Sequence, residues 1–311
     1  MGVPQGSYLG PLLLLIYIND LAKIDLHGKP RLFADDTSLS YENEDPEEIV
    51  RQITEDLEKV HGFFTENLLS LNLEKTKYIL FRSPRLRVSP HSDVIVSSTK
   101  IDEVEYFKYL GLNLDATLSW NQHITELRKC VSSTCGALWR VSKFMPQKAL
   151  ETMYHAFIQS KLNYLVAIWG AATKTRLKPL QVTQNRCLKV VYKKNNLYST
   201  LDLYNEAKAS ILPIPALREI QCLCHIHNLL YNPHAHHNQT LSQRSHRYQL
   251  RNPATVVVNR LNTELGNKSV AYHSKTRFNS LPADLKSEHV GKKFKDKIKL
   301  RIRSRMMDSL Y

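Results

Sequence analysis

Residues 31–41, RLFADDTSLSY, place two adjacent carboxylates between two short runs of strand-forming residues. The runs RLFA and SLSY predict strands, and Asp35-Asp36-Thr37 between them predicts the turn of a β-hairpin. Adjacent carboxylates repel each other unless a proton or a cation lies between them, so the hairpin apex presents this pair to a hard divalent ion such as Mg²⁺. Side chains alternate along a strand, which makes one Asp the main ligand and the other a supporting one. The alternative is ordinary turn chemistry, which also uses Asp.

An apolar segment, PLLLLIYI at 11–18, precedes the hairpin. Pro11 suits the first turn of a helix, and the segment to about Lys23 is apolar nearly all round, which predicts a buried helix. The run is far shorter than the roughly 20 residues that span a bilayer. Residues 1–7 carry no Lys or Arg, so we also exclude a signal peptide and expect a chain that is neither secreted nor embedded in a membrane.

A second helix and further strands follow the hairpin. Asp45 and Pro46 form a helix start, with a capping side chain followed by proline at the first helical position. Apolar residues then recur at the helical period, at Ile49, Ile53, Leu57, Val60 and Phe64. Strands are expected at about 77–82, 93–98 and 106–114. The alternation of short strands with helices over residues 1–120 predicts an α+β fold.

From about residue 122 the apolar period becomes helical. Four helices are expected, with core stripes beginning near Ile124, Leu150, Leu177 and Pro215. Residues 232–290 are polar and predict loops and short pieces. The tail at 291–305, GKKFKDKIKLRIRSR, holds eight basic residues and one acid. In it Phe294, Ile298 and Ile302 are spaced as on one face of a basic amphipathic helix. We therefore expect three parts, 1–120, 121–231 and 232–311.

The composition is that of a folded, basic protein. The 311 residues are 42% hydrophobic and 23% charged, with a net charge of +14, which argues against a largely disordered chain. The positive charge favours a polyanionic partner, either nucleic acid or an anionic membrane surface. Five cysteines are too few, and odd in number, for a disulfide framework, so a reducing compartment is expected.

A cysteine and histidine cluster suggests a zinc site only at first sight. Cys222, Cys224 and His227 lie close in sequence, and further histidines follow at His234, His236 and His237. The Cys-x-Cys spacing differs from that of zinc sites, and the two thiols fall on different sides of the expected helix. We therefore expect helix core rather than a metal site here.

Several short motifs occur in one order along the chain: GVPQGSYLGP at 2–11, YINDL at 17–21, LFADDT at 32–37, LSLNLEKT at 69–76, YLG at 109–111 and LD at 114–115. As an ordered set they resemble the reverse transcriptases of non-LTR retrotransposons, particularly the jockey and CR1-like LINE elements. The resemblance covers residues 1–120 and continues more loosely through QNR at 184–186 and FNSLP at 278–282.

The resemblance implies a polymerase palm followed by a helical thumb-like domain, and RNA-directed DNA synthesis with two magnesium ions. The implied partners are an RNA template, a DNA primer and deoxynucleoside triphosphates, and the implied location is the nucleus, otherwise the cytoplasm. Site roles carry over by motif: Asp35 as the chief metal ligand, Asp36 as its neighbour, Gln5 and Gly6 against template and nucleotide, Lys75 at the leaving pyrophosphate, and Tyr109, Leu110 and Gly111 as the primer grip.

One departure from the family limits these expectations. In the family a first acidic motif, with another metal-binding Asp, lies upstream of the GVPQG turn, whereas Met1 directly precedes that turn here. Asp20 is no substitute, because it follows the turn. We therefore expect this chain alone not to polymerise, and an apolar helix to be left exposed. The alternative is a non-catalytic nucleic-acid-binding relic that works through basic residues such as Arg186, Lys189, Lys193, Lys194 and those at 292–305.

Overall fold

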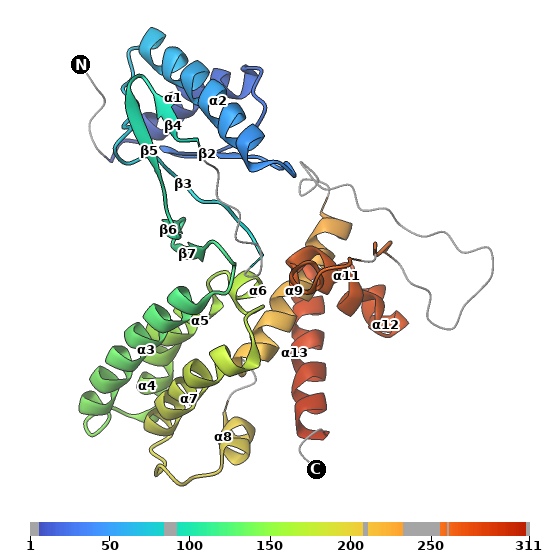
Figure 1. Ribbon diagram of the computed structural model, residues 1–311. Coiled ribbons are helices and arrows are strands. Elements are labelled where there is room, and N and C mark those ends of the chain that lie inside the picture. Colours follow the sequence, from blue (N-terminus) through green and yellow to red (C-terminus); the bar gives the residue numbers. More distant parts are fainter. Residues whose placement is uncertain (1–5, 84–91, 208–210, 233–255, 260, 309–311) are drawn as a thin grey trace, which may run out of the picture. The chain divides into compact units, whose positions relative to one another are not determined.

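Short strands and helices alternate in the N-terminal part of the chain, and helices dominate the remainder, so the predicted α+β class is confirmed. The structure is a computed structural model that describes residues 6–83, 92–207, 211–232, 256–259 and 261–308 (Figure 1). The chain forms two units, Met1–Ser119 (unit 1) and Trp120–Tyr311 (unit 2).

The described residues of unit 1 form three small sheets and two α-helices. Its elements are α1 (Leu9–Ile18), the 3-10 helix η1 (Asn19–Lys23), β1 (Lys29–Phe33), β2 (Asp36–Ser40), α2 (Pro46–Glu66), β3 (Lys77–Tyr78), β4 (Val94–Val96), β5 (Thr99–Glu103), β6 (Tyr106–Tyr109) and β7 (Leu112–Asp115). The β1–β2 and β6–β7 pairs are antiparallel hairpins. In the third sheet β5 lies between antiparallel β4 and parallel β3.

Helix α2 supplies much of the core of unit 1. Asp45 caps its first turn by accepting a hydrogen bond from the Glu47 amide at 3.0 Å. Its N-terminal half packs Val50 and Ile53 against the β4–β5 strands, and its C-terminal half contacts the end of α1 and η1. The buried side chains of these two clusters are Val50, Ile53, Val94, Val96 and Ile101 in the first, and Ile18, Leu21, Val60 and Phe64 in the second.

The prediction that the first helix is buried is wrong. Within α1 only Ile18 is buried, while Leu12 is 53% and Ile16 64% exposed. A helix that is apolar on every side needs packing partners all around. In the described part of unit 1 the core cluster at this helix includes only its C-terminal residue Ile18. The second expectation for this segment, that its apolar helix is left exposed, agrees with the structure.

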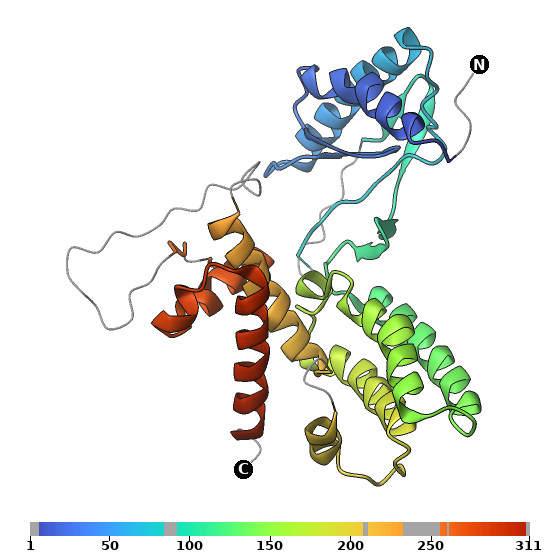
Figure 2. The same ribbon diagram turned by 180° about the vertical axis from the view of Figure 1, so that it is seen from behind.

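Unit 2 consists mainly of helices. They are α3 (Asn121–Val141), α4 (Gln147–Tyr154), the π-helical segment η2 (His155–Gln159), α5 (Ser160–Asn163), α6 (Val166–Trp169), α7 (Lys174–Val191), α8 (Thr200–Glu206), α9 (Ile214–Tyr231), α10 (Glu264–Lys268), α11 (Val270–Asn279), α12 (Ala283–Lys286) and α13 (Gly291–Asp308). Helix α3 packs along α7, and α9 packs against α6, α11 and α13 (Figure 2). No helix in the described ranges has the length and apolarity needed to cross a membrane.

Two helical predictions fare differently. The basic amphipathic helix is confirmed as α13, with Phe294, Ile298 and Ile302 all buried. The expected stripe from Leu150 to Trp169 is a broken helix, because a π-helical segment and a positive φ of 50° at Leu165 interrupt it. Phe157, expected in that stripe, is 52% exposed. The extra residue in a π turn rotates the face of the helix, which explains this error.

The half-buried His273 on α11 is expected to make unit 2 sensitive to acid. Burial, with help from the nearby Arg218 and Arg277, lowers the pKa of His273 on α11 to about 4. The unfolded chain therefore binds the proton more readily, and stability falls as the pH drops from 6.5 towards 4. We expect His273→Gln to flatten this part of the pH dependence, measured as the difference between variant and parent unfolding midpoints across that range. Equal slopes would contradict the assignment.

Candidate functional site: an acidic hairpin joined to a second hairpin

The predicted hairpin is confirmed as β1–β2, but its turn lies one residue earlier than the expected Asp35-Asp36-Thr37. Phe33 pairs with Asp36, so Ala34 and Asp35 form a two-residue turn, and Ala34 has a positive φ of 53°. Asp35 lies in the turn and Asp36 begins β2, and both are exposed. Among the described residues neither carboxylate has a hydrogen-bond or ion-pair partner. The pair is thus held on a defined turn with its oxygens open to a cation.

The structure joins this hairpin to the predicted primer-grip segment. The Ser38 hydroxyl on β2 lies 3.0 Å from the Tyr109 hydroxyl on β6. Leu110 and Gly111 form the β6–β7 turn, with φ values of 45° and 79°. Two positive φ values are the requirement of a type I′ hairpin turn, which favours glycine at the second place. This hydroxyl contact therefore places Tyr109 beside β2, the strand that begins with Asp36.

A buried carboxylate at the base of the acidic hairpin was not predicted from the sequence. Asp56 on α2 is fully buried and accepts hydrogen bonds from the amides of His27, at 3.1 Å, and Gly28, at 2.8 Å. It also accepts a bond of 3.1 Å from the Tyr41 hydroxyl. Gly28 directly precedes β1 and Tyr41 directly follows β2, so one carboxylate fixes both ends of the hairpin.

The surroundings of this carboxylate explain two features of the sequence. Burial, followed by the neighbouring Asp56 charge, raises the pKa of Tyr41 well above its ordinary value. A Cβ at Gly28 would lie 2.6 Å from the Tyr41 ring, so glycine is required by close approach. The available signal was the position of Asp56 within the apolar stripe of α2, three residues after Ile53 and four before Val60.

The other predicted site residues are only partly placed. Gly6 has a φ of 88°, which favours glycine, while Gln5 lies outside the described residues. Lys75 lies in an exposed turn before β3, where its amide donates to the Asn72 side chain at 3.0 Å. Across the described ranges no hydrogen bond or ion pair joins Lys75 to either carboxylate of the hairpin. The role of this lysine at the leaving pyrophosphate stays a prediction.

We searched the part of the chain that the structure describes for clusters of side chains that could bind a metal ion. It contains no group of three or more His, Cys, Asp or Glu side chains that could hold an ion. In the cluster considered for zinc, Cys222 is buried, and the His227 ring stacks on Phe294 and bonds to the Glu288 carbonyl at 2.7 Å. The later histidines His234, His236 and His237 lie outside the described residues.

The basic residues expected to contact nucleic acid have different environments. Lys189 donates to the Asn196 carbonyl at 2.6 Å, and Lys194 pairs with Glu206 at 2.8 Å. Lys193 is exposed, as is Arg186, and neither has an ion pair within the described residues.

Comparison with known proteins shows what the N-terminal part of the chain is similar to. Residues 1–114 match the family model of reverse transcriptase (RNA-dependent DNA polymerase). The predicted resemblance to reverse transcriptases is thereby confirmed for this segment, and the transposable-element relatives that follow support its non-LTR part.

Relatives from transposable elements extend the similarity beyond that segment. The chain is 26% identical over 197 residues to the probable RNA-directed DNA polymerase from transposon X-element, and 29% over 201 residues to that from transposon BS, both of Drosophila melanogaster. Each alignment covers 61% of this chain, but 21% and 22% of those proteins respectively. The RNA-directed DNA polymerase from mobile element jockey of the same species is 23% identical over 201 residues, covering 60% of this chain and 21% of that protein.

The chain thus spans about a fifth of the length of these relatives. No solved structure matches it.

Proposed function

We propose that unit 1 is part of an RNA-directed DNA polymerase of a non-LTR retrotransposon, with Asp35 and Asp36 contributing to its metal-dependent nucleotidyl transfer. The observation that carries this proposal is the unpaired carboxylate pair on a turn that Asp56 holds at its base and Ser38 joins to Tyr109. Its substrates are an RNA template, a DNA primer and deoxynucleoside triphosphates. The proposal includes nuclear action, for which the basic α13 is a candidate import signal.

Reverse transcriptases as a family use divalent metal ions, and the choice of magnesium is part of the proposal. The donors at the turn fit it, because carboxylate oxygens are the ligands that this ion prefers. Bound ions in such enzymes stabilise the attacking and leaving oxygens. The residues of this chain supply the anionic oxygens of Asp35 and the supporting charge of Asp36. The described residues offer no third carboxylate at this turn, so we propose that another ligand comes from a first acidic motif, as the resemblance implies.

The second candidate function is nucleic-acid binding without catalysis. It is favoured by the distribution of charge in unit 2, where residues 127–201 contain thirteen lysines and arginines and a single acidic residue. Such a surface binds phosphate backbones irrespective of sequence.

Nucleic-acid binding with and without Mg²⁺, measured beside primer extension on an RNA template, separates the two functions. We expect residues 1–311 alone not to extend the primer with Mg²⁺. Metal-dependent binding that Asp35→Ala weakens would favour the proposed metal site, whereas tight, salt-sensitive binding that Asp35→Ala leaves unchanged would favour nucleic-acid binding without catalysis. Extension that Asp35→Ala abolishes would overturn the expected inactivity and support catalysis at the hairpin. Extension that this variant does not affect would overturn the role of Asp35.

A further inference from the structure

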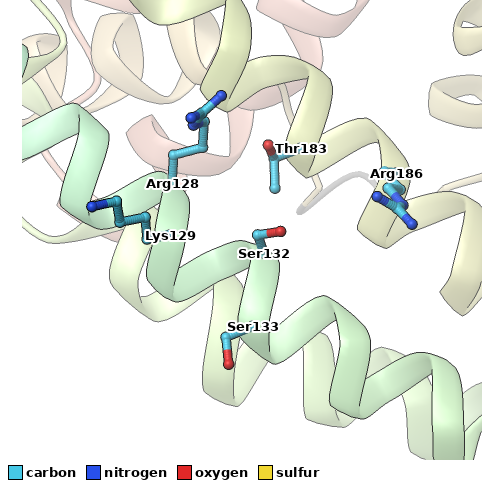
Figure 3. A pocket seen from close by; sticks show the side chains of 6 residues that line it. All are labelled: Arg128, Lys129, Ser132, Ser133, Thr183 and Arg186. Atoms are coloured by element: carbon cyan, nitrogen blue, oxygen red, sulfur yellow. The ribbon is translucent and has the colours of Figure 1, made fainter.

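A groove of about 530 Å³ lies between α3 and α7 of unit 2 (Figure 3). All six residues that line it have polar side chains, with two cations and two hydroxyls from α3 and one of each from α7: Arg128, Lys129, Ser132, Ser133, Thr183 and Arg186. Guanidinium, ammonium and hydroxyl groups are all hydrogen-bond donors, and this combination is suited to phosphate oxygens.

Basic residues outnumber acidic ones around the groove. Among the described residues Arg128, Lys129 and Arg186 have no carboxylate partner. Glu126, which is exposed on α3 two residues before Arg128, accepts a hydrogen bond from Gln122 at 2.8 Å. The single acid within 127–201, Glu151, is buried and accepts a hydrogen bond from Gln147 on its own helix. An excess of one sign of charge along a cleft attracts the opposite sign from solution. The groove therefore favours a polyanion.

The face of α3 that lines the groove continues to an exposed tryptophan. Trp139 follows Arg128 by eleven residues, close to three helical turns, so both lie on one side of the helix about 16 Å apart. Trp139 is 56% exposed, whereas the other two tryptophans, Trp120 and Trp169, are buried. The Lys143 ammonium lies 5.6 Å from the centroid of its ring. An exposed ring beside cations is the usual platform for an unpaired base.

We propose that this groove and Trp139 together bind single-stranded nucleic acid, with phosphates between α3 and α7 and a base stacked on Trp139. An exposed indole that accepts a base selects unpaired strands, because in a duplex the faces of the bases are covered by their neighbours. RNA and DNA share the phosphodiester chemistry that the groove recognises. The site does not depend on the hairpin carboxylates, so it stands or falls independently of the proposed polymerase function.

Charge-matched variants of the full chain test the groove. The groove variant carries Arg128→Gln, Lys129→Gln and Arg186→Gln, and the control carries Lys148→Gln, Lys174→Gln and Lys178→Gln, three exposed lysines of unit 2 outside the lining. With oligothymidylate and oligouridylate of ~20 nucleotides, the groove variant is expected to bind about tenfold or more weakly, with a salt slope smaller by about 2. The control is expected to stay within about threefold of the parent. Equal losses in both variants would reduce the groove to general electrostatics and overturn the proposal.

Tryptophan fluorescence tests the stacking. Single strands are expected to quench Trp139, while a duplex of the same length leaves the emission nearly unchanged. Trp139→Phe should retain binding and lose the quenching, and Trp139→Ala should weaken binding about tenfold. Comparing the affinities for oligothymidylate and oligouridylate shows whether the site prefers DNA or RNA. Tighter binding and stronger quenching by the duplex would show that the surface fits paired nucleic acid and overturn the proposal.

Discussion

Asp56→Ala is expected to lower the free energy of unfolding of unit 1 by about 4 kcal/mol, because it removes a charged acceptor from three donors at once. Two of these donors are the backbone amides of His27 and Gly28, which no substitution can remove. The amide of Gly28 is buried and would be left without a partner, and such a group costs about 1–3 kcal/mol. Urea unfolding gives the total loss, and hydrogen exchange across residues 27–41 assigns it to the hairpin.

Three further variants make this expectation specific. Glu58→Ala removes an exposed carboxylate from the same helix and should change stability by less than about 0.5 kcal/mol. Tyr41→Phe removes one donor and should cost about 1 kcal/mol. Asp56→Asn retains the shape but turns an N–H₂ group towards a donor, so it should fall between Tyr41→Phe and Asp56→Ala. If Asp56→Ala were as mild as Glu58→Ala, the carboxylate would not be what fixes the hairpin.

The spacing of apolar residues predicted those helices and strands that bury one face and expose the other. Helix α13 has Phe294, Ile298 and Ile302 at intervals of four, with mostly basic residues between them, and this single buried face is sufficient to specify it. The acidic hairpin was also predictable, because its turn signals lie between two short strands. The placement of Asp35 in the turn and Asp36 in the strand depends on the register, which the sequence alone does not set.

What the sequence did not reveal depends on contacts between distant segments. Strand β5 was missed because its sequence TKIDE is short and polar, with Ile101 as its one buried residue, and pairing with β3 and β4 on either side is what makes it a strand. Asp56 looked like one more helix charge until the loop at His27 and Gly28 provided its donors. The exposure of α1 likewise depends on which other elements pack against it, because its apolar composition alone indicates burial.

The geometry of the hairpin restricts how the two carboxylates can share a role. Asp35 is in the turn, where no cross-strand neighbour flanks it, while Asp36 is paired opposite Phe33. A ligand at the turn can move towards an ion with little cost, whereas one in the ladder is fixed by its backbone pairing. This asymmetry supports the proposed assignment of Asp35 as the chief ligand and Asp36 as the supporting charge.

In a polypeptide that carries a first acidic motif ahead of residues 1–311 and extends a primer on an RNA template, Asp35→Asn is expected to lower kcat by about a thousandfold or more. The reason is that an amide replaces an anionic oxygen where charge develops in the transition state. Asp36→Asn should have a smaller effect. KM for the primer–template should change little in both variants, since backbone contacts elsewhere provide the binding.

Asp25→Asn is the matched control, because it changes an exposed carboxylate of unit 1 outside the hairpin and should leave kcat within about twofold. Binding of Mn²⁺, followed by its paramagnetic relaxation of water, gives a second readout that does not depend on turnover. It should weaken in Asp35→Asn and persist in Asp25→Asn, because only the former removes a ligand at the turn. Full activity with Asp35→Asn would remove the hairpin from the catalytic site, whereas loss of activity with unchanged Mn²⁺ binding would leave Asp35 a role other than metal ligation.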